Sequence, residues 1–176
     1  MYVVFLCCVF AVAVNAGNIC LQAFQCFHKP TPVEVSDLVI VNPENGTITI
    51  STNILDVYCP YISEVVVCTK EYGNVCSTEH VAFFERIWNI YKTICQDYQT
   101  ELTAMINVCF NDLSYQSQLR SCSENEAAMK SDNCGDRVDS LTTCIQGVVQ
   151  QCSPENAHAI IPTIEAVKPL SCENEG

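Results

Sequence analysis

The cysteines are the residues of this chain best suited to chemistry. The sequence has 176 residues and 14 cysteines, a thiol content that allows either disulfide formation or metal binding. Twelve of them form two runs of six, which are Cys20, Cys26, Cys59, Cys68, Cys76 and Cys95, followed by Cys109, Cys122, Cys134, Cys144, Cys152 and Cys172. The last four cysteines of each run keep nearly the same spacing, and a serine follows the fifth cysteine in both. The pattern predicts a duplicated six-cysteine unit.

The spacing of these cysteines favours disulfides over a metal site. A structural zinc site needs short pairs such as Cys-x2-Cys, with histidines at fixed offsets. No such pair occurs here, and His28, His80 and His158 stand far apart in the sequence. An even number of cysteines at ordered spacings in an exported chain indicates a disulfide framework. We therefore expect structural disulfides, no metal ligands and no cofactor.

No arrangement of residues specifies a nucleophilic enzyme. A serine or cysteine nucleophile needs a histidine base and an orienting acid, and no nucleophile-elbow glycine pattern is present. Secreted phospholipases carry a paired-cysteine, histidine, aspartate signature, but adjacent cysteines occur here only at Cys7 and Cys8. We expect a protein that is not an enzyme and has no catalytic residues.

Residues 1–16 are typical of a secretory signal peptide. An uncharged apolar run extends from Tyr2 to Val14, and small residues occupy the two positions before the expected cleavage point, Val14 and Ala16. The run is too short to span a membrane, which takes about 20 residues, and no second long apolar run follows. We expect cleavage after Ala16, secretion to the extracellular space and no membrane partner.

The acidic composition limits the classes of partner. Twenty Asp and Glu residues against eight Lys and Arg give a net charge of −12, which repels nucleic acid and anionic membrane surfaces. The acidic residues are scattered, and none of them forms the alternating oxygen-rich loop that binds calcium tightly. We expect no nucleic-acid partner, while basic partners and a diffuse association with calcium stay open.

Residues 33–50 predict a small β-hairpin. β-branched and apolar residues alternate in part on both sides of Asn42-Pro43-Glu44-Asn45-Gly46, which is a strong turn signal. The hairpin reads as an insertion into the first unit, because the interval from Cys26 to Cys59 is much longer than the equivalent interval in the second unit. Asn45-Gly46-Thr47 is also an N-glycosylation acceptor, so we predict a glycan on Asn45.

The rest of the chain, after Ile54, has helical periodicity. We expect a helix that begins at Pro60 and ends before Gly73. A long helix, capped by Ser77 or Thr78, should then run to Cys109, with a bend near Thr100 allowed.

Three further signals divide the second unit. The capping box Ser123-x-x-Glu126 predicts the start of a short helix, and an apolar stripe from Val138 to Cys152 predicts the next helix. Ser153-Pro154-Glu155 predicts the start of the last helix, which Pro162 can kink and Pro169 ends.

Helix lengths suggest the disulfide pairing. The segments on either side of Cys76 span roughly 25 and 28 Å as helices, so an antiparallel arrangement brings Cys59 to Cys95. The same reasoning brings Cys134 to Cys172. Six cysteines allow fifteen connectivities, so the other pairs stay open; among them we adopt Cys20–Cys76, Cys26–Cys68, Cys109–Cys152 and Cys122–Cys144.

These expectations combine into one architecture. We predict a mainly α fold, a disulfide-stapled helical bundle built from two six-cysteine helical units with a small hairpin inserted in the first. After the signal peptide, the units occupy residues 17–95 and 96–176 and pack as one compact domain.

The segment Cys144-Ile-Gln-Gly-Val-Val-Gln-Gln-Cys152-Ser, with the closing pair Cys172-Glu173, resembles the C-terminal part of invertebrate secreted cysteine-rich helical proteins. These include a nematode-expanded domain of unknown function and the insect haemolymph 27-kilodalton glycoproteins. The similarity extends over residues 109–172 and rests on cysteine spacing. The resemblance implies secretion, helices and disulfides, and supplies no functional residues.

The sequence favours binding over catalysis. The first hypothesis is an interaction protein of the extracellular fluid or matrix, monomeric or weakly dimeric, whose partner is an unknown extracellular protein. The second is a carrier of a small apolar ligand or lipid lined by Phe84, Trp88 and Tyr91, although aromatic residues at helical spacing also predict an ordinary core. The third is an acidic matrix component that associates with calcium.

Overall fold

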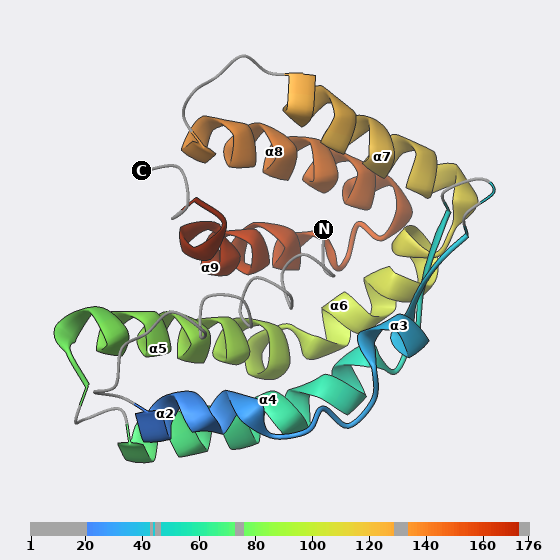
Figure 1. The fold of residues 1–176 in the computed structure, drawn as a ribbon. Helices are drawn as coiled ribbons and strands as arrows, with labels where there is room; N and C mark the ends of the chain where they lie inside the picture. Colours follow the sequence, from blue (N-terminus) through green and yellow to red (C-terminus); the bar gives the residue numbers. More distant parts are fainter. Residues whose placement is uncertain (1–20, 43, 45–46, 73–75, 129–133, 173–176) are drawn as a thin grey trace.

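A computed structural model of the chain describes residues 21–42, 44, 47–72, 76–128 and 134–172, without the side chains of residues 125–128 and 169–172. It confirms the predicted fold class, a mainly helical, disulfide-stapled bundle with one small antiparallel hairpin (Figure 1). The elements in chain order are α2 (Leu21–Gln25), η2 (Cys26–His28), α3 (Val35–Leu38), β1 (Val39–Val41), β2 (Ile48–Ile50), α4 (Ile54–Tyr72), α5 (Thr78–Tyr91), η4 (Lys92–Asp97), α6 (Gln99–Met105), η5 (Ile106–Phe110), α7 (Leu113–Ala128), α8 (Cys134–Cys152), η6 (Ala157–Ala159) and α9 (Ile160–Cys172).

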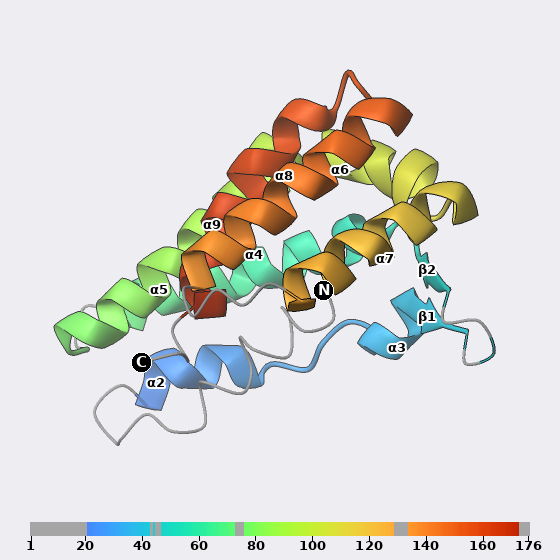
Figure 2. The same cartoon turned by 90° about the horizontal axis from the view of Figure 1, so that it is seen from above.

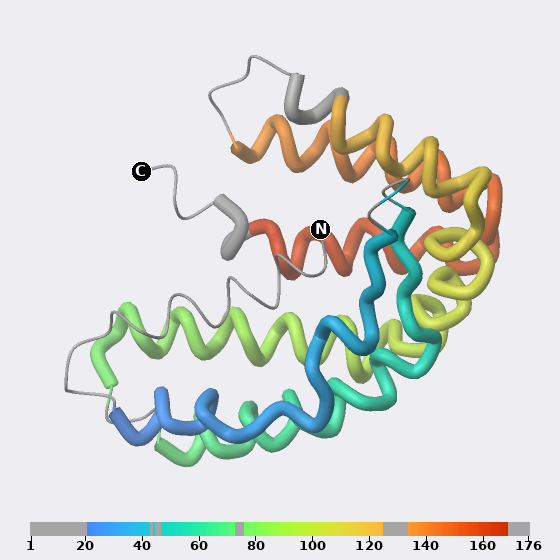
Figure 3. Tube along the Cα trace, turned by 45° about the vertical axis from the view of Figure 1, so that its right-hand side comes forward, coloured from blue at the N-terminus to red at the C-terminus, as the bar shows by residue number. Residues whose placement is uncertain are grey.

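The long helices form a stack in the order α4, α5, α9, α8, α7, in which neighbours run in opposite directions (Figures 1 and 3). The short helix α2 lies against α4 (Figure 2). The segment from η4 through η5, which contains α6, connects α5, the second helix of the stack, to α7 at the edge opposite α4 (Figure 1). The last helix is therefore inserted between the two parts of the chain that precede it. The two sequence halves meet where α9 contacts α5 and η4, and where η5 contacts β2.

Two apolar clusters make up the described core. One contains the aromatic residues of α2, η2, α4 and α5, and the other lies between η4, α6, α8 and α9. The clusters do not divide at residue 95, because Ile90 and Ile94 belong to the second and Ile106 to the first. The division of the chain into units 17–95 and 96–176 remains a prediction.

Four disulfides are described, and they are four of the six expected pairs: Cys26–Cys68, Cys59–Cys95, Cys109–Cys152 and Cys122–Cys144. Each lies within one of the two cysteine runs, so none of these four crosses between the sequence halves. Cys76 and Cys134 are also disulfide-bonded. Their expected partners, Cys20 and the side chain of Cys172, lie outside the described residues.

The hairpin is shorter than the sequence predicts. β1 and β2 pair antiparallel with Val39 opposite Ile50, whereas Val35–Leu38 forms the helical turn α3 instead of the first part of a strand. Leu38 is buried in the first core cluster, and a helical turn followed by a strand places both Leu38 and Val39 against that cluster. The expectation of a strand from residue 33 was therefore wrong.

The helix α4 begins at Ile54, six residues before the proline that we expected at its start. Pro60 lies inside the helix, where it cannot donate a hydrogen bond to the carbonyl of Asp56. The preceding turn contributes Ile54 and Tyr58 to the core, where both are buried. Burial of these two large side chains offsets one missing backbone hydrogen bond.

The long helix expected from residue 78 to Cys109 is interrupted. α5 and α6 each widen at their C-terminal end into a π-helical segment, η4 after α5 and η5 after α6. The helical conformation is interrupted at Tyr98, between η4 and α6. The break lies close to the expected bend near Thr100. Each widened segment carries a bridged cysteine, Cys95 in η4 and Cys109 in η5.

The helix boundaries of the second half also differ from expectation. Ser123 and Glu126 lie inside α7, which begins at Leu113 after Asp112, whose carboxylate accepts a hydrogen bond from the Ser114 N–H at 2.8 Å. The capping-box prediction was wrong because Asp112 is the residue that caps the helix.

The last helix also has bounds different from those expected. α9 begins at Ile160 after a turn and η6, and it continues past Pro169 to Cys172. Pro162 stands in its first turn, where the missing N–H has no helical acceptor to lose. Pro169 removes one hydrogen bond without ending the helix.

Candidate functional site

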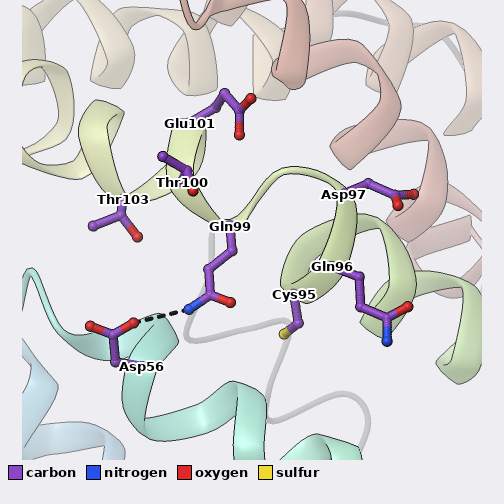
Figure 4. A pocket seen from close by; sticks show the side chains of 8 residues that line it. All are labelled: Asp56, Cys95, Gln96, Asp97, Gln99, Thr100, Glu101 and Thr103. Atoms are coloured by element: carbon purple, nitrogen blue, oxygen red, sulfur yellow. Dashed lines mark hydrogen bonds between the residues drawn. The ribbon is translucent and has the colours of Figure 1, made fainter.

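A polar cleft lies where the helical run from α5 to α6 is interrupted (Figure 4). Its volume is about 470 Å³, and its walls come from the first turn of α4, from η4 and from α6. The lining residues are Asp56, Cys95, Gln96, Asp97, Gln99, Thr100, Glu101 and Thr103. Every lining residue except Cys95 is polar and three are carboxylates, so the cleft suits a polar, cationic group.

The widened turn and the break at Tyr98 give the cleft its shape. The Tyr98 N–H donates to the Thr93 carbonyl at 3.1 Å, five residues back, which is the hydrogen bond of a π turn. Tyr98 itself has φ −132° and ψ 18°, outside the helical region, so the chain changes direction before α6 begins. This change of direction places the polar residues of η4 and α6 on adjoining walls.

A disulfide and a hydrogen bond hold the walls together. Cys59 in α4 is bonded to Cys95 in η4, with Cα atoms 5.5 Å apart. The Gln99 side chain donates from Nε2 to Oδ1 of Asp56 at 2.9 Å, across the cleft (Figure 4). Because the walls are joined covalently, a ligand would bind to a preformed site and would lose less binding free energy to ordering of the protein.

The cleft keeps a negative character. In the described part of the chain, two basic side chains approach its carboxylates: Lys92 Nζ lies 3.9 Å from Asp97 Oδ2, and His158 Nε2 lies 3.9 Å from Glu101 Oε1. Both distances are long for an ion pair, and exposed pairs of this kind contribute little free energy. His158 is charged only when protonated. The field in the cleft therefore attracts cations.

The cleft does not assemble a metal site. Throughout the ranges that the structure describes, no group of three or more His, Cys, Asp or Glu side chains is placed to hold a metal ion. A cationic side chain or organic cation needs no fixed coordination geometry, so the spread carboxylates of the cleft remain suitable for such a group.

The aromatic residues that the sequence offered as an apolar lining are placed elsewhere. Phe84 has no exposed surface and contacts the rings of Phe24, Phe27 and Phe83 at centroid distances of 5.4, 6.3 and 5.8 Å. None of Phe84, Trp88 and Tyr91 lines the cleft.

Trp88 is fixed by polar contacts at the edge of the same cluster. Its Nε1 donates to Thr69 Oγ1 at 2.9 Å, and the Lys70 ammonium lies 5.3 Å from the ring centroid. The structure thus brings Phe84, Trp88 and Tyr91 into or against one apolar cluster, where their packing against neighbouring side chains accounts for their spacing.

One serine and one histidine lie close together, at the start of α5. Ser77 Oγ is 2.8 Å from His80 Nδ1, a distance suitable for a nucleophile and its base. The same position in the second half holds Ser153, whose Oγ accepts a hydrogen bond from Asn156 Nδ2 at 2.8 Å. Because an amide occupies the place of the imidazole there, the feature that the two halves share is a hydrogen bond between a serine and the residue three positions later.

The cleft residues were missed by the sequence analysis, although a signal exists. Five polar residues, which are Gln96, Asp97, Gln99, Thr100 and Glu101, occur within six positions of an otherwise amphipathic run. Such a polar cluster in a predicted amphipathic helix indicates that the helix is interrupted there or that this part of it is exposed to solvent. The predicted glycosylation site, Asn45, lies outside the described residues.

Comparisons of the chain with family models, with curated proteins and with solved structures find no match. The resemblance to invertebrate secreted cysteine-rich helical proteins therefore remains a prediction. Within the described ranges, no helix combines the length and the apolar character that crossing a membrane requires.

Proposed function

We propose that the protein is a non-enzymatic extracellular binding protein, and that the acidic cleft receives a cationic group of its partner, such as a lysine or arginine side chain. The observation that carries this proposal is the set of three carboxylates, Asp56, Asp97 and Glu101, on walls joined by the Cys59–Cys95 disulfide. The net charge of −12 supports it, because a protein-wide negative field accelerates encounter with a basic partner.

The extracellular assignment rests on the cysteines. Disulfides persist in oxidising compartments and are rare in the cytosol, and ten cysteines of the described chain are disulfide-bonded. A bonded framework also suits a binding role, since it keeps the cleft in one shape.

The two other hypotheses lead to different ligands. A carrier of apolar ligands would need free volume beside Phe84, Trp88 and Tyr91, and Phe84 is fully enclosed by other side chains. A calcium-associating matrix protein would use the same carboxylates that line the cleft, but it would bind calcium weakly at several dispersed sites. Both are therefore included as outcomes of the test.

The test is a titration monitored by amide NMR spectra, in which the ¹⁵N-labelled protein is titrated with tetralysine. We expect shifts at Asp97, Gln99 and Glu101 and their loss in the triple variant Asp56→Asn, Asp97→Asn, Glu101→Gln. The matched control is Glu71→Gln, Glu79→Gln, Glu124→Gln, which removes the same three charges at exposed positions outside the cleft. The control should bind tetralysine as the unmodified protein does, apart from the small loss caused by the lower total charge.

Three results would argue against the proposal. Equal losses of binding in the two triple variants would show that the total charge, and not the cleft, attracts the peptide. Shifts at the cleft with calcium chloride but not with tetralysine would favour the calcium hypothesis. A lipid co-purifying with the protein, detected by native mass spectrometry, would favour the carrier.

A further inference from the structure

The two outer edges of the β-hairpin differ in whether their backbone groups have hydrogen-bond partners. Two backbone hydrogen bonds identify the hydrogen-bonded residue pairs of the ladder. Ser51 N–H donates to the Leu38 carbonyl at 2.7 Å, and Asn42 N–H donates to the Thr47 carbonyl at 2.8 Å. Because bonded and non-bonded pairs alternate in an antiparallel ladder, the pairs Val39–Ile50 and Val41–Ile48 direct their backbone groups outward. Each strand therefore offers the N–H and C=O groups of two residues to its surroundings.

The outer edge of β2 is closed by side chains. Ile50 N–H donates to Asn111 Oδ1 at 2.8 Å, and Asn111 Nδ2 donates to the Ile50 carbonyl at 2.7 Å. Ile48 N–H donates to Gln116 Oε1 at 3.1 Å, and Gln116 Nε2 donates to the Ile48 carbonyl. The two amides thus take the place of a third strand.

The outer edge of β1 has no such cover. The Val39 N–H donates to the Val35 carbonyl, but within the described residues the Val39 carbonyl and both backbone groups of Val41 have no partner. The side chains beside them are apolar and open to solvent: Ile40 is 59% exposed and Val41 is 55% exposed. An uncapped edge with exposed apolar side chains is the kind of surface that adds an extended peptide.

The charge around β1 indicates what kind of peptide fits. No lysine or arginine occurs between Lys29 and Lys70 in the sequence, and Glu34, Asp37 and Glu44 are exposed near the strand. Burial, and then the carboxylates of Glu34 and Asp37, raise the pKa of Tyr58 in α4. A second copy of this chain would bring like charges together, whereas a basic peptide would meet opposite charges.

We propose that β1 is a docking strand for an extended segment of another protein in which apolar residues alternate with lysine or arginine. The segment gains up to three backbone hydrogen bonds, at the Val39 carbonyl and at the N–H and C=O of Val41. Because successive residues of a strand point to opposite faces, the apolar side chains of the segment lie on one face, beside Val41. Its basic side chains lie on the other face, where their aliphatic stems cover Ile40 and their charged ends approach Asp37 and Glu44. This surface is distinct from the acidic cleft and does not depend on the function proposed for it.

The experiment measures fluorescence anisotropy of a labelled nine-residue peptide in which valine alternates with lysine and threonine. We expect saturable binding that falls at least tenfold when alternate peptide amides are N-methylated, because N-methylation removes the donors and leaves the charge unchanged. Val41→Pro, which removes the outward N–H at an edge position that tolerates proline, should weaken binding to a similar degree. Ile40→Lys should weaken it by repelling the basic peptide, and the matched control Val67→Lys, at a 65% exposed position on α4, should not.

The outcomes separate this proposal from the one on the cleft. Binding that survives N-methylation and Val41→Pro but is lost in the triple cleft variant would overturn the docking strand and support the cleft. Absence of binding to the unmodified protein at millimolar peptide would overturn it outright. A concentration-dependent dimer in sedimentation velocity that disappears in Ile40→Lys would show that the occupant of β1 is a second copy. Circular dichroism of both β1 variants shows whether each is folded. If Val41→Pro does not fold, Ile40→Lys alone is a sufficient test.

Discussion

The side chain of Asn111 forms two hydrogen bonds with the backbone of Ile50, one as donor at 2.7 Å and one as acceptor at 2.8 Å. The two residues are 61 positions apart, so the pair connects the hairpin to the segment between η5 and α7. A side-chain amide presents one donor and one acceptor side by side, which is the arrangement that a paired strand presents.

We predict that Asn111→Ala lowers the free energy of unfolding by about 1–3 kcal/mol, since both partly buried backbone groups of Ile50 lose their partners. Asn111→Asp should also destabilise, because the carboxylate cannot donate to the Ile50 carbonyl. Urea unfolding monitored by tryptophan fluorescence measures both. The matched control is Gln118→Ala, whose amide makes one long, exposed contact within its own helix at 3.4 Å; an equal effect in the control would refute the role of Asn111.

The stability of the protein should fall at alkaline pH because of two tyrosines. The Tyr58 hydroxyl donates to the Val33 carbonyl at 2.9 Å and that of Tyr61 to the Lys29 carbonyl at 3.2 Å. Burial raises the pKa of both phenols above the ordinary value; the carboxylates of Glu34 and Asp37 add to the shift of Tyr58, and Tyr58 adds to that of Tyr61. In the folded state each therefore keeps its proton to a higher pH than in the unfolded state.

The direction of the effect follows from proton linkage. Below the unfolded pKa of about 10 the contribution of these groups is fully present, and above it the unfolded state releases protons first, so stability declines until the folded pKa is reached. The slope is up to about 1.4 kcal/mol per pH unit for each tyrosine. Urea midpoints between pH 8 and pH 11 measure this decline, and Tyr58→Phe with Tyr61→Phe should flatten it. An unchanged slope in the double variant would assign the decline to other groups.

Gly147 offers a stabilising substitution. It lies exposed in the middle of α8, and a Cβ atom added there would meet no other atom within 4 Å. Gly147→Ala should raise the free energy of unfolding by about 0.5–1 kcal/mol, because glycine loses more backbone entropy than alanine on entering a helix. Gly147→Val should give a smaller gain, since a β-branched side chain is a poorer helix former. If thermal unfolding ranked valine above alanine, a tertiary contact would have to be invoked instead.

The equivalent disulfides of the two halves should differ in their contribution. Cys26–Cys68 and Cys122–Cys144 join the second and fourth cysteines of their runs, with sequence separations of 42 and 22. Replacing either pair by alanine should cost about 3–4 kcal/mol by the chain-entropy argument, and loss of the longer loop should cost roughly 0.6 kcal/mol more. Urea unfolding of the two double variants measures the order. The reverse order would indicate that native packing, and not loop length, sets the contribution of each disulfide.

The sequence predicted those features that depend on local pattern. The stripe from Val138 to Cys152 became α8, and the turn residues around Asn42 mark the hairpin because their backbone preferences resist both helix and strand. Helix rise led to Cys59–Cys95, because it fixes how far apart two cysteines lie along a helix. The other three described pairs agree with pairs that were adopted among open alternatives.

Features that depend on tertiary packing were not predictable. Pro60 is a strong helix-start signal, yet the burial of Ile54 and Tyr58 extends α4 in front of it. The start of α7 was missed although Tyr115, Leu119 and Cys122 recur at helical spacing and pack in the second core cluster. These apolar residues are few among many polar ones, and the Asp112 cap stands before them. The acidic cleft depends on the break at Tyr98, where no glycine or proline announces a change of direction.

The π-helical segments restrict how relatives of this protein can differ in length. A π turn contains one more residue than an α turn, and each residue advances a helix by about 100°. Deleting one residue from η4 would restore an α turn and rotate everything downstream, so that Glu101 would leave the cleft that it lines together with Asp56. A deletion before Cys95 would also turn Cys95 away from Cys59. Alignment gaps in homologous sequences should therefore avoid the interval between Cys95 and Cys109, and conservation of its length would help to recognise distant relatives when residue identity has been lost.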